Sequence, residues 1–357
     1  MGSNAITGIE GRVMGGVSAG LYRKPPWHGV GEVKDSKGKH IGEKRQLNDD
    51  VRHISTIKIL AGLEWEPRSI NLSDLVEADQ GRWIVGTNIQ SDRQMLVRDN
   101  FPSQYDAYDL GVHSGKYGVI TNDQGLSFAE EIMKHRSDAK LRSVTTLYGG
   151  RIVFAVLEFH DGVDVTRRNG EKLDKNTKFM GIYWSHDGSH PLGVKYMRNE
   201  WVCENTFTPW NAETGLVVRH TVNAADRASD ALRAIEGMMK SMDEFDLEIQ
   251  RLTHIPLLKP TGAFVRDLIG QRPQEKVTAG GKVSDRGGIN WDKQFEAMVA
   301  EMNEYTDATS AFDFVMAVQG YEQHRQPVRG GGRDVKTITR LMRDDFPLTK
   351  AAAGLFA

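Results

Sequence analysis

The sequence predicts an α+β fold in which antiparallel β-hairpins form a sheet, a long helix packs on that sheet, and the C-terminal region is mostly helical. Three observations predict it. Residues 149–159 and 178–185 are nearly unbroken apolar, β-branched and aromatic runs with the length of buried strands. The Asp187-Gly188 pair follows the second run and is a strong hairpin signal, because both residues tolerate positive φ. Residues 228–252 then carry apolar side chains at spacings of three and four, which is helical periodicity.

Composition limits the class of protein. The chain has 357 residues, 39% of them hydrophobic and 26% charged, which suits a globular protein of two or three domains. A single cysteine cannot form an internal disulfide and is typical of a reducing cytoplasm. No apolar run approaches the roughly 18 residues of a membrane span, and the N-terminus lacks a secretion-signal pattern. We therefore expect a cytoplasmic protein without a membrane segment. Its net charge of −2 means that any nucleic-acid contact must come from local basic segments.

The first third is expected to be a flexible arm, residues 1–20, followed by an α+β region, residues 21–139. The arm is Gly/Ser-rich and has little apolar periodicity. Asn48 is expected to cap a helix whose apolar residues recur every three positions up to Leu60. Short strands are expected at 64–72, 82–88 and 94–99, and a helix at 124–138 with Ser127 near its start.

Residues 140–258 are expected to form a β-sheet and long-helix core. The two apolar runs read as a long hairpin with a charged tip, the Asp-Gly turn leads into a strand beginning at Leu192, and 215–222 is a further strand. Asn223 can cap the long helix, and Pro256 and Pro260 follow its end. The apolar face of this helix either packs across the sheet or forms a seam between subunits.

The last region, residues 259–357, is expected to be helical. It contains a flexible linker at 276–290, a helical pattern from 291 to 325, a glycine-rich break at 329–334 and a last short helix at 334–345.

Neither a metal site nor a catalytic centre is predicted. His186 and His190 are potential ligands four residues apart, but the Asp-Gly turn lies between them and removes the geometry of a helical pair. Cys203 is the only cysteine and is expected to pack as a small apolar residue. No Walker-type phosphate loop is present. We therefore expect no cofactor.

Two basic segments, 167–178 and 325–343, are the candidates for phosphate contact. Proteins that bind single strands combine a cationic groove with aromatic stacking surfaces, and these segments adjoin aromatic residues. The predicted nucleic-acid-binding residues are Arg167, Arg168, Lys172, Lys175, Lys178, Trp184, Arg198, Arg219, Arg325, Arg329, Arg333, Lys336 and Arg340.

An ordered set of short motifs carries a family resemblance. The motifs are "PPWHGVG" (25–31), "AGLEWE" (61–66), "KYGVITNDQGLSFAEE" (116–131), "WSHDGS" (184–189), "VCENTF" (202–207), "VVRHT" (217–221) and "AVQGYEQH" (317–324). Together they resemble the phage/plasmid-like protein family defined by domain of unknown function 932, over most of 21–325. The strand-hairpin-strand-helix order of 140–258 is also similar to the core of single-strand annealing proteins of the RecT and Beta kind.

The resemblance implies a protein of phages or plasmids that acts on DNA in the cytoplasm of a bacterial host. The leading hypothesis is a DNA-associated protein that binds single strands, promotes their annealing in recombination or replication, and assembles as a homo-oligomer through the long helix. One alternative is an enzyme or an inhibitor of a host enzyme that uses the neighbourhood of His186, Asp187, Cys203, Arg219 and His220. The other is an oligomeric protein that acts by contact with a host component.

Overall fold

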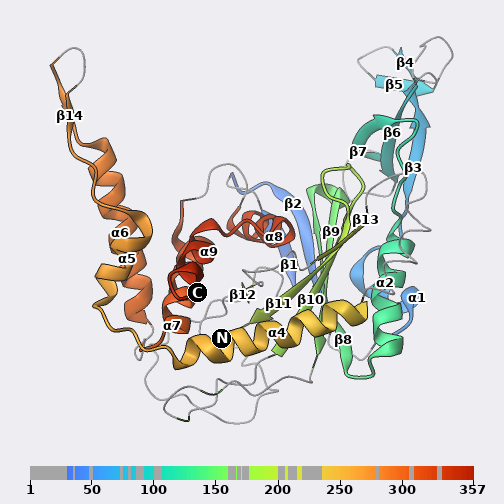
Figure 1. Ribbon diagram of the computed structural model, residues 1–357. Coiled ribbons are helices and arrows are strands. Elements are labelled where there is room, and N and C mark those ends of the chain that lie inside the picture. Colours follow the sequence, from blue (N-terminus) through green and yellow to red (C-terminus); the bar gives the residue numbers. More distant parts are fainter. Residues whose placement is uncertain are drawn as a thin grey trace, which may run out of the picture.

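A computed structural model gives the fold of the protein. The structure describes residues 30–34, 37–47, 51–72, 75–78, 82–85, 92–99, 107–159, 166, 170, 177–199, 206–207, 215–218, 235–277, 281–304, 309–327 and 332–357. The predicted α+β class is confirmed: antiparallel sheets are combined with a helical C-terminal region (Figure 1). The expected N-terminal arm at 1–20 and the expected cap at Asn223 lie outside the described residues.

An eight-stranded antiparallel sheet forms the centre of the molecule, in the order β1-β2-β8-β9-β10-β11-β12, with β13 also pairing with β11. Its strands are β1 (Gly31–Lys34), β2 (His40–Gln46), β8 (Ala139–Leu147), β9 (Ile152–Phe159), β10 (Thr177–Ser185), β11 (Leu192–Asn199), β12 (Thr206–Phe207) and β13 (Gly215–Val218). The two predicted apolar runs are β9 and β10, which pair as a hairpin. The predicted turn connects β10 to β11, and Gly188 adopts the positive φ of +69° that favours glycine there.

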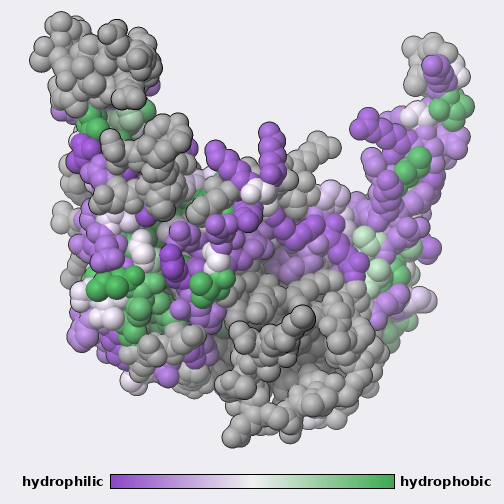
Figure 2. Space-filling model, turned by 180° about the vertical axis from the view of Figure 1, so that it is seen from behind, coloured by the Kyte–Doolittle hydropathy of each residue, from purple (hydrophilic) through white to green (hydrophobic). Residues whose placement is uncertain are grey.

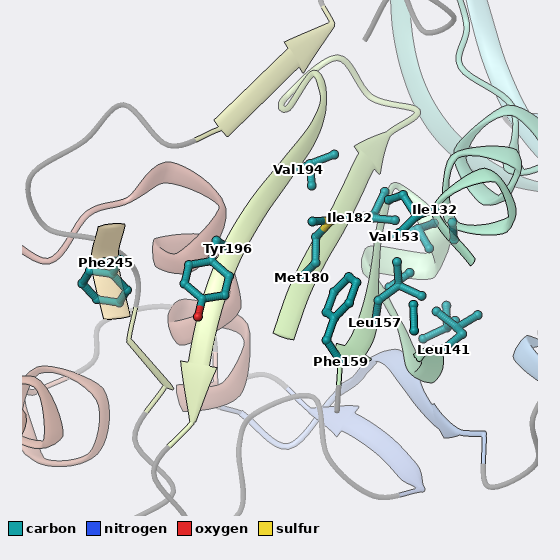
Figure 3. Close-up of a cluster of buried hydrophobic side chains, with 14 of the residues drawn as sticks. Ile132, Leu141, Val153, Leu157, Phe159, Met180, Ile182, Val194, Tyr196 and Phe245 are labelled. Atoms are coloured by element: carbon teal, nitrogen blue, oxygen red, sulfur yellow. The ribbon is translucent and has the colours of Figure 1, made fainter. Parts of the chain in front are cut away.

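Both faces of this sheet are buried. Val153, Ala155 and Leu157 of β9 lie in a cluster on one face, whereas Phe154 and Val156 belong to a second cluster on the other. Figure 3 shows the first cluster, to which neighbouring strands and the helices on that face contribute. Burial on both faces removes the polar alternation of a half-exposed strand, which explains the unbroken apolar run in the sequence.

The helices that contribute to the first cluster include α1 (Ile54–Ala61), α2 (Asn122–His135) and α4 (Ile235–His254), and the cluster continues into the C-terminal helices. Phe245 of α4 packs edge-on against Tyr196, with ring centroids 6.0 Å apart (Figure 3). The helix crosses the sheet as expected (Figure 1). The alternative of a subunit seam stays a prediction.

The ends of α1 and α2 differ from the sequence-based expectation. Residues 51–53 precede α1 without helical structure, because the extended backbone of His53 places the helix start there rather than near Asn48. Helix α2 begins before Ser127, since Thr121 and Gln124 form a reciprocal capping box at its N-terminus.

The C-terminal helices are α5 (Thr261–Ile269), α6 (Arg286–Glu304), α7 (Ala311–Gly320) with its π-helical extension η3 (Tyr321–Arg325), α8 (Arg333–Arg343) and α9 (Pro347–Gly354). Within the expected linker, β14 (Lys276–Val277) pairs with β15 (Val283–Ser284) between α5 and α6. Helix α9 was not predicted, because its short alanine-rich sequence has no amphipathic repeat. Glu322 holds it in place by accepting hydrogen bonds from the backbone N–H and hydroxyl of Thr349, 2.9 and 2.6 Å away.

Two arms project from this body (Figures 1 and 2). One arm carries the three-stranded sheet of β3 (Pro67–Asn71), β6 (Arg93–Asp99) and β7 (Ala107–Ser114), with the pair β4 (Leu75–Ala78) and β5 (Arg82–Val85) at its end. The other is the α5–α6 hairpin with the β14–β15 ribbon at its tip. A short 3-10 turn, η2 (Tyr148–Gly150), joins β8 to β9. Across the described ranges, no helix combines the length and apolarity needed to span a bilayer.

Candidate nucleic-acid interface

Helix α8 presents cations on one side and buries its other side against the central sheet. Val335, Ile338, Leu341 and Met342 belong to the second apolar cluster, together with side chains of β9, β10 and β11. The cations of α8 follow one another at spacings of three, four and three, which places them along one side of a helix. We call these residues the α8 basic stripe: Arg333, Lys336, Arg340 and Arg343.

Contacts at both ends hold the stripe in place. Asp334 pairs with Lys44 of β2, which ties the start of α8 to the sheet. Further along, the Arg340 Nη1 donates to the backbone carbonyl of Glu322 at 3.1 Å and to the Gln326 side chain at 2.7 Å. The helix ends at Asp344, which adopts a left-handed conformation with φ of 55°.

Arg333 and Lys336 donate to neutral backbone carbonyls, whereas Arg340 also lies 3.8 Å from a carboxylate oxygen of Glu322 and 3.8 Å from one of Asp345. Arg333 donates to the carbonyl of Gln323 at 3.1 Å, and the Lys336 ammonium donates to the carbonyl of Pro327 at 3.3 Å. Burial lowers the pKa of Lys336, and the positive charges of Arg340 and Arg333 lower it further, against a smaller opposing effect of Asp345. The repulsion among these cations indicates a positive electrostatic potential around the stripe. A bound anion would reduce this potential.

Arg343 is the last cation of the stripe. It was not among the binding residues predicted from the sequence, although its position three residues after Arg340 places it on the same side of the helix. Its guanidinium is exposed, and its Nε lies 3.3 Å from the Nε2 of His190. Burial and the charge of Arg343 lower the pKa of His190, which favours the neutral ring. Since the Nε2 accepts from Arg343, the proton sits on Nδ1 and is donated to the Ser189 hydroxyl, 2.8 Å away. This histidine therefore cannot act as the base for that serine.

Burial argues against two of the predicted binding residues, Trp184 and Lys178, while Arg325 is engaged in an ion pair and its binding role stays a prediction. The Trp184 side chain is fully buried, and its indole N–H donates to Asn122 at 3.2 Å, so no ring face is open to a base. Lys178 is 4% exposed, and its ammonium lies 2.9 Å from a carboxylate oxygen of Asp246. Arg325 pairs with the buried Glu301. Arg340 is also largely buried, at 9% exposure. It therefore contributes its positive charge to the stripe rather than N–H groups that a ligand could reach.

The other predicted residues are not placed by the structure. Those outside the described residues are Arg167, Arg168, Lys172, Lys175, Arg219 and Arg329. Arg198 lies in β11, but its side chain is outside the described part, and Cys203 and His220 of the alternative enzyme site are outside it as well. The β9–β10 connection is described at Thr166, whose backbone N–H donates to Gln250 of α4 at 3.0 Å.

Three of the quoted motifs meet in one buried hydrogen-bond network around Asn122. Its amide nitrogen donates to the carbonyl of Trp65 at 2.7 Å, and its amide oxygen lies 3.1 Å from the Nε2 of His186 and accepts from Trp184. The carboxylate of Glu66 accepts from the backbone N–H of Asn122 at 2.8 Å. Histidine 186 therefore serves the packing of the sheet against α2 and has no exposed surface for catalysis.

No group of His, Cys, Asp and Glu side chains in the described ranges is arranged to hold a metal ion. The two histidines of the β10–β11 turn point to different partners, Asn122 for His186 and Arg343 for His190.

The fold and the site define an α+β protein with a sheet covered on both faces and a cationic helix on one of them. Residues 109–343 match the model of the family described as Domain of unknown function (DUF932). Because the match spans most of the chain, from β7 to α8, the protein belongs to this family. Comparison with curated proteins and with solved structures found no match.

Proposed function

We propose that the protein binds single-stranded DNA, with the α8 basic stripe holding the phosphate backbone. The observation that carries the proposal is the alignment of its four cations along one side of a helix that is anchored to the sheet. Lysine and arginine are the residues that neutralise DNA phosphates, and their contacts release counterions. In the view of Figure 1, α8 lies between the two arms, and Figure 2 shows the open space between these projections from behind.

The composition of the stripe supports a phosphate ligand over an isolated carboxylate. A phosphate chain presents negative charges repeatedly, and the stripe presents cations repeatedly along its length. Arg343 is exposed and keeps the fork of donors that suits phosphate. The basic segment 167–178, known here from sequence alone, would provide a second contact.

The proposal extends to the biological role expected from the motifs. It describes a phage- or plasmid-encoded protein in the cytoplasm of a bacterial host, which assembles as a homo-oligomer and promotes strand annealing in recombination or replication. Neighbouring subunits would hold one strand extended with its bases accessible, as annealing requires.

The salt dependence of binding tests the stripe directly. The variant Lys336→Ala/Arg343→Ala removes two stripe cations and leaves the more deeply engaged Arg333 and Arg340 in place. Loss of two phosphate contacts should reduce the slope of log K against log salt by about 1.4 for single strands. The matched control Lys134→Ala/Lys140→Ala removes two cations from α2 and β8. Fluorescence anisotropy with a labelled single strand and its duplex, at several salt concentrations, measures the affinity and its dependence on salt.

Three results would each contradict a part of the proposal. If the wild-type protein binds neither strand at low salt, nucleic-acid binding itself is wrong. If the α8 variant and the control variant show the same affinity and slope as the wild type, the protein binds DNA through another surface. Equal or stronger binding to the duplex would reject the preference for single strands.

A further inference from the structure

Arg343 differs from other exposed arginines in what its guanidinium contacts. The guanidinium of Arg251, for example, binds the carboxylate of Glu248 through two nitrogens, at 2.7 and 2.8 Å. Arg343 forms no ion pair with a carboxylate of the described residues, and its contact there is the hydrogen bond from Nε to the Nε2 of His190 at 3.3 Å. Because the side chain is exposed, the two terminal nitrogens, Nη1 and Nη2, keep N–H donors that a ligand can reach.

The carboxylates that follow Arg343 in the sequence interact with other cations. Asp344 pairs with Lys350 at 2.8 Å, and Asp345 lies 3.8 Å from Arg340. Both negative charges reduce the positive potential at the end of α8. Neither occupies the terminal nitrogens of Arg343, which therefore remain available to a bound anion.

Hydrogen bonds fix both the backbone and the ring of His190. The fully buried hydroxyl of Ser185 donates to the carbonyl of His190 at 2.6 Å and accepts from its backbone N–H at 3.0 Å. The ring is 4% exposed, and its Nδ1 donates to the Ser189 hydroxyl at 2.8 Å, which leaves Nε2 as the acceptor for Arg343. Asp187 accepts from the backbone N–H of Ser189 at 2.9 Å and so holds the turn that carries this ring.

A guanidinium held through Nε presents its terminal nitrogens on the opposite side. Because the group is planar, the contact at Nε restricts the directions of Nη1 and Nη2. An exposed side chain that moves freely loses this freedom when it binds a ligand, whereas a side chain that is already held loses less. The fork of two N–H groups suits two oxygens of one phosphate. Arg343 is therefore oriented before a phosphate arrives.

We propose that His190 is a positioning residue for DNA binding, which holds Arg343 through Nε so that Nη1 and Nη2 bind one phosphate of the strand. The proposal rests on the proposed function, because Arg343 belongs to the α8 basic stripe. His190 itself does not touch the DNA. It gives the β10–β11 turn, within the motif at 184–189 and the residue that follows it, a part in binding that acts through the end of α8.

The test removes or replaces the acceptor at His190. His190→Leu fills the buried position without an acceptor, whereas His190→Gln carries an amide oxygen the same number of bonds from the backbone as Nε2. His190→Leu is also combined with Arg343→Ala, so that the two changes form a double-mutant cycle. The matched control is His135→Leu, at an exposed histidine on α2. The probe is a labelled single-stranded oligonucleotide, and fluorescence anisotropy measures its affinity.

We expect His190→Leu to bind about fivefold more weakly, because Arg343 must then be ordered by the ligand. His190→Gln should restore the affinity to within about twofold of the wild type. In the Arg343→Ala background, His190→Leu should change the affinity by less than about twofold, since the residue through which it acts is absent. His135→Leu should match the wild type. Thermal unfolding followed by circular dichroism shows whether each variant is folded.

Arg343→Lys tests the same geometry at an exposed position, and it decides the question if His190→Leu does not fold. Lysine keeps the charge but has neither the Nε donor nor the fork. We expect about fivefold weaker binding with an unchanged salt slope. Binding equal to that of the wild type would show that charge alone is sufficient and would overturn the inference.

The remaining outcomes separate the two proposals. If the wild type does not bind single-stranded DNA, the proposed function fails and takes this inference with it. If the wild type binds and a folded His190→Leu variant matches His135→Leu, the inference alone is overturned. Equal weakening by His190→Leu in the wild-type and Arg343→Ala backgrounds would assign His190 to the general packing of the turn, which also overturns it.

Discussion

Asn122 shows how one residue can join separate parts of the sequence. Its side chain donates to the carbonyl of Trp65 and accepts from Trp184, while its amide oxygen also lies beside the Nε2 of His186. Asparagine suits this position because one side chain supplies both a donor and an acceptor. The motifs at 61–66, 116–131 and 184–189 are therefore connected through a single buried amide, which gives them a structural reason to occur together.

Asn122→Ala should lower the free energy of unfolding by about 3 kcal/mol, because it leaves several buried polar groups without this partner. The control Ser127→Ala changes an exposed position on the same helix and should stay within about 0.5 kcal/mol of the wild type. Urea unfolding measures the change in the free energy of unfolding for both variants. An unchanged midpoint for Asn122→Ala would show that the network contributes little to stability.

The attachment of α4 depends on a buried charge pair as well as on apolar packing. Asp246 is fully buried, accepts from the Tyr196 hydroxyl at 3.3 Å and pairs with Lys178 of β10. A lone carboxylate at this position would be strongly disfavoured, since burial removes its hydration. The lysine therefore belongs to the link between sheet and helix.

Lys178→Met should destabilise the protein by about 3 kcal/mol, because the carboxylate of Asp246 loses its cation. The double variant Lys178→Met/Asp246→Leu should recover much of this loss, since an apolar pair of similar size needs no desolvation of charge. Guanidinium unfolding of the two variants gives the comparison. A double variant less stable than the single one would show that the pair has a different role.

Helix α9 is held by a carboxylate whose titration affects stability. Burial raises the pKa of Glu322 above its ordinary value of 4.5, although hydrogen bonds from Thr349 and Leu348 and the charge of Arg340 act in the opposite direction. The folded state thus binds the proton more tightly than the unfolded state does. The resulting stabilisation is fully present below about pH 4.5 and is lost as pH rises through the higher folded pKa.

Glu322→Gln removes this titration. The free energy of unfolding of the wild type should therefore fall relative to that of Glu322→Gln as pH rises above about 4.5. Urea unfolding from about pH 4 to about pH 8 measures the difference. Glu296→Gln, at an exposed position on α6, serves as the control. A constant difference between wild type and Glu322→Gln across this range would contradict the proposed coupling.

At the scale of the whole molecule, stability should be concentrated in the central sheet. Strands β9 and β10 are buried on both faces and paired on both sides, whereas the ribbon at the end of the α5–α6 arm is exposed. Local opening requires little free energy where few apolar contacts are lost.

Hydrogen exchange should therefore be slowest for the backbone amides of β9 and β10 and fast for those of 276–277 and 283–284. Exchange followed by mass spectrometry resolves these segments. Added single-stranded DNA should slow exchange around α8 and should leave β9 unchanged. Unchanged exchange around α8 at a saturating DNA concentration would contradict the proposed role of the α8 basic stripe.

Elements whose signals are local could be predicted from the sequence. The apolar runs at β9 and β10, the Asp187-Gly188 turn and the periodicity of α4 depend on neighbours a few residues away, and all three appear in the structure. Helix α9 was missed because its position depends on Glu322, which lies 27 residues from Thr349 along the chain.

The accessibility of polar and aromatic side chains, in contrast, depends on packing between elements that are distant in the sequence. Trp184 and Lys178 resemble binding residues in the sequence, but their partners Asn122 and Asp246 are distant along the chain and bury them. Arg343 remains exposed at the end of α8, because that helix turns its apolar side toward the sheet. Burial depends on the element that packs above a side chain, and no local pattern in the sequence specifies that element.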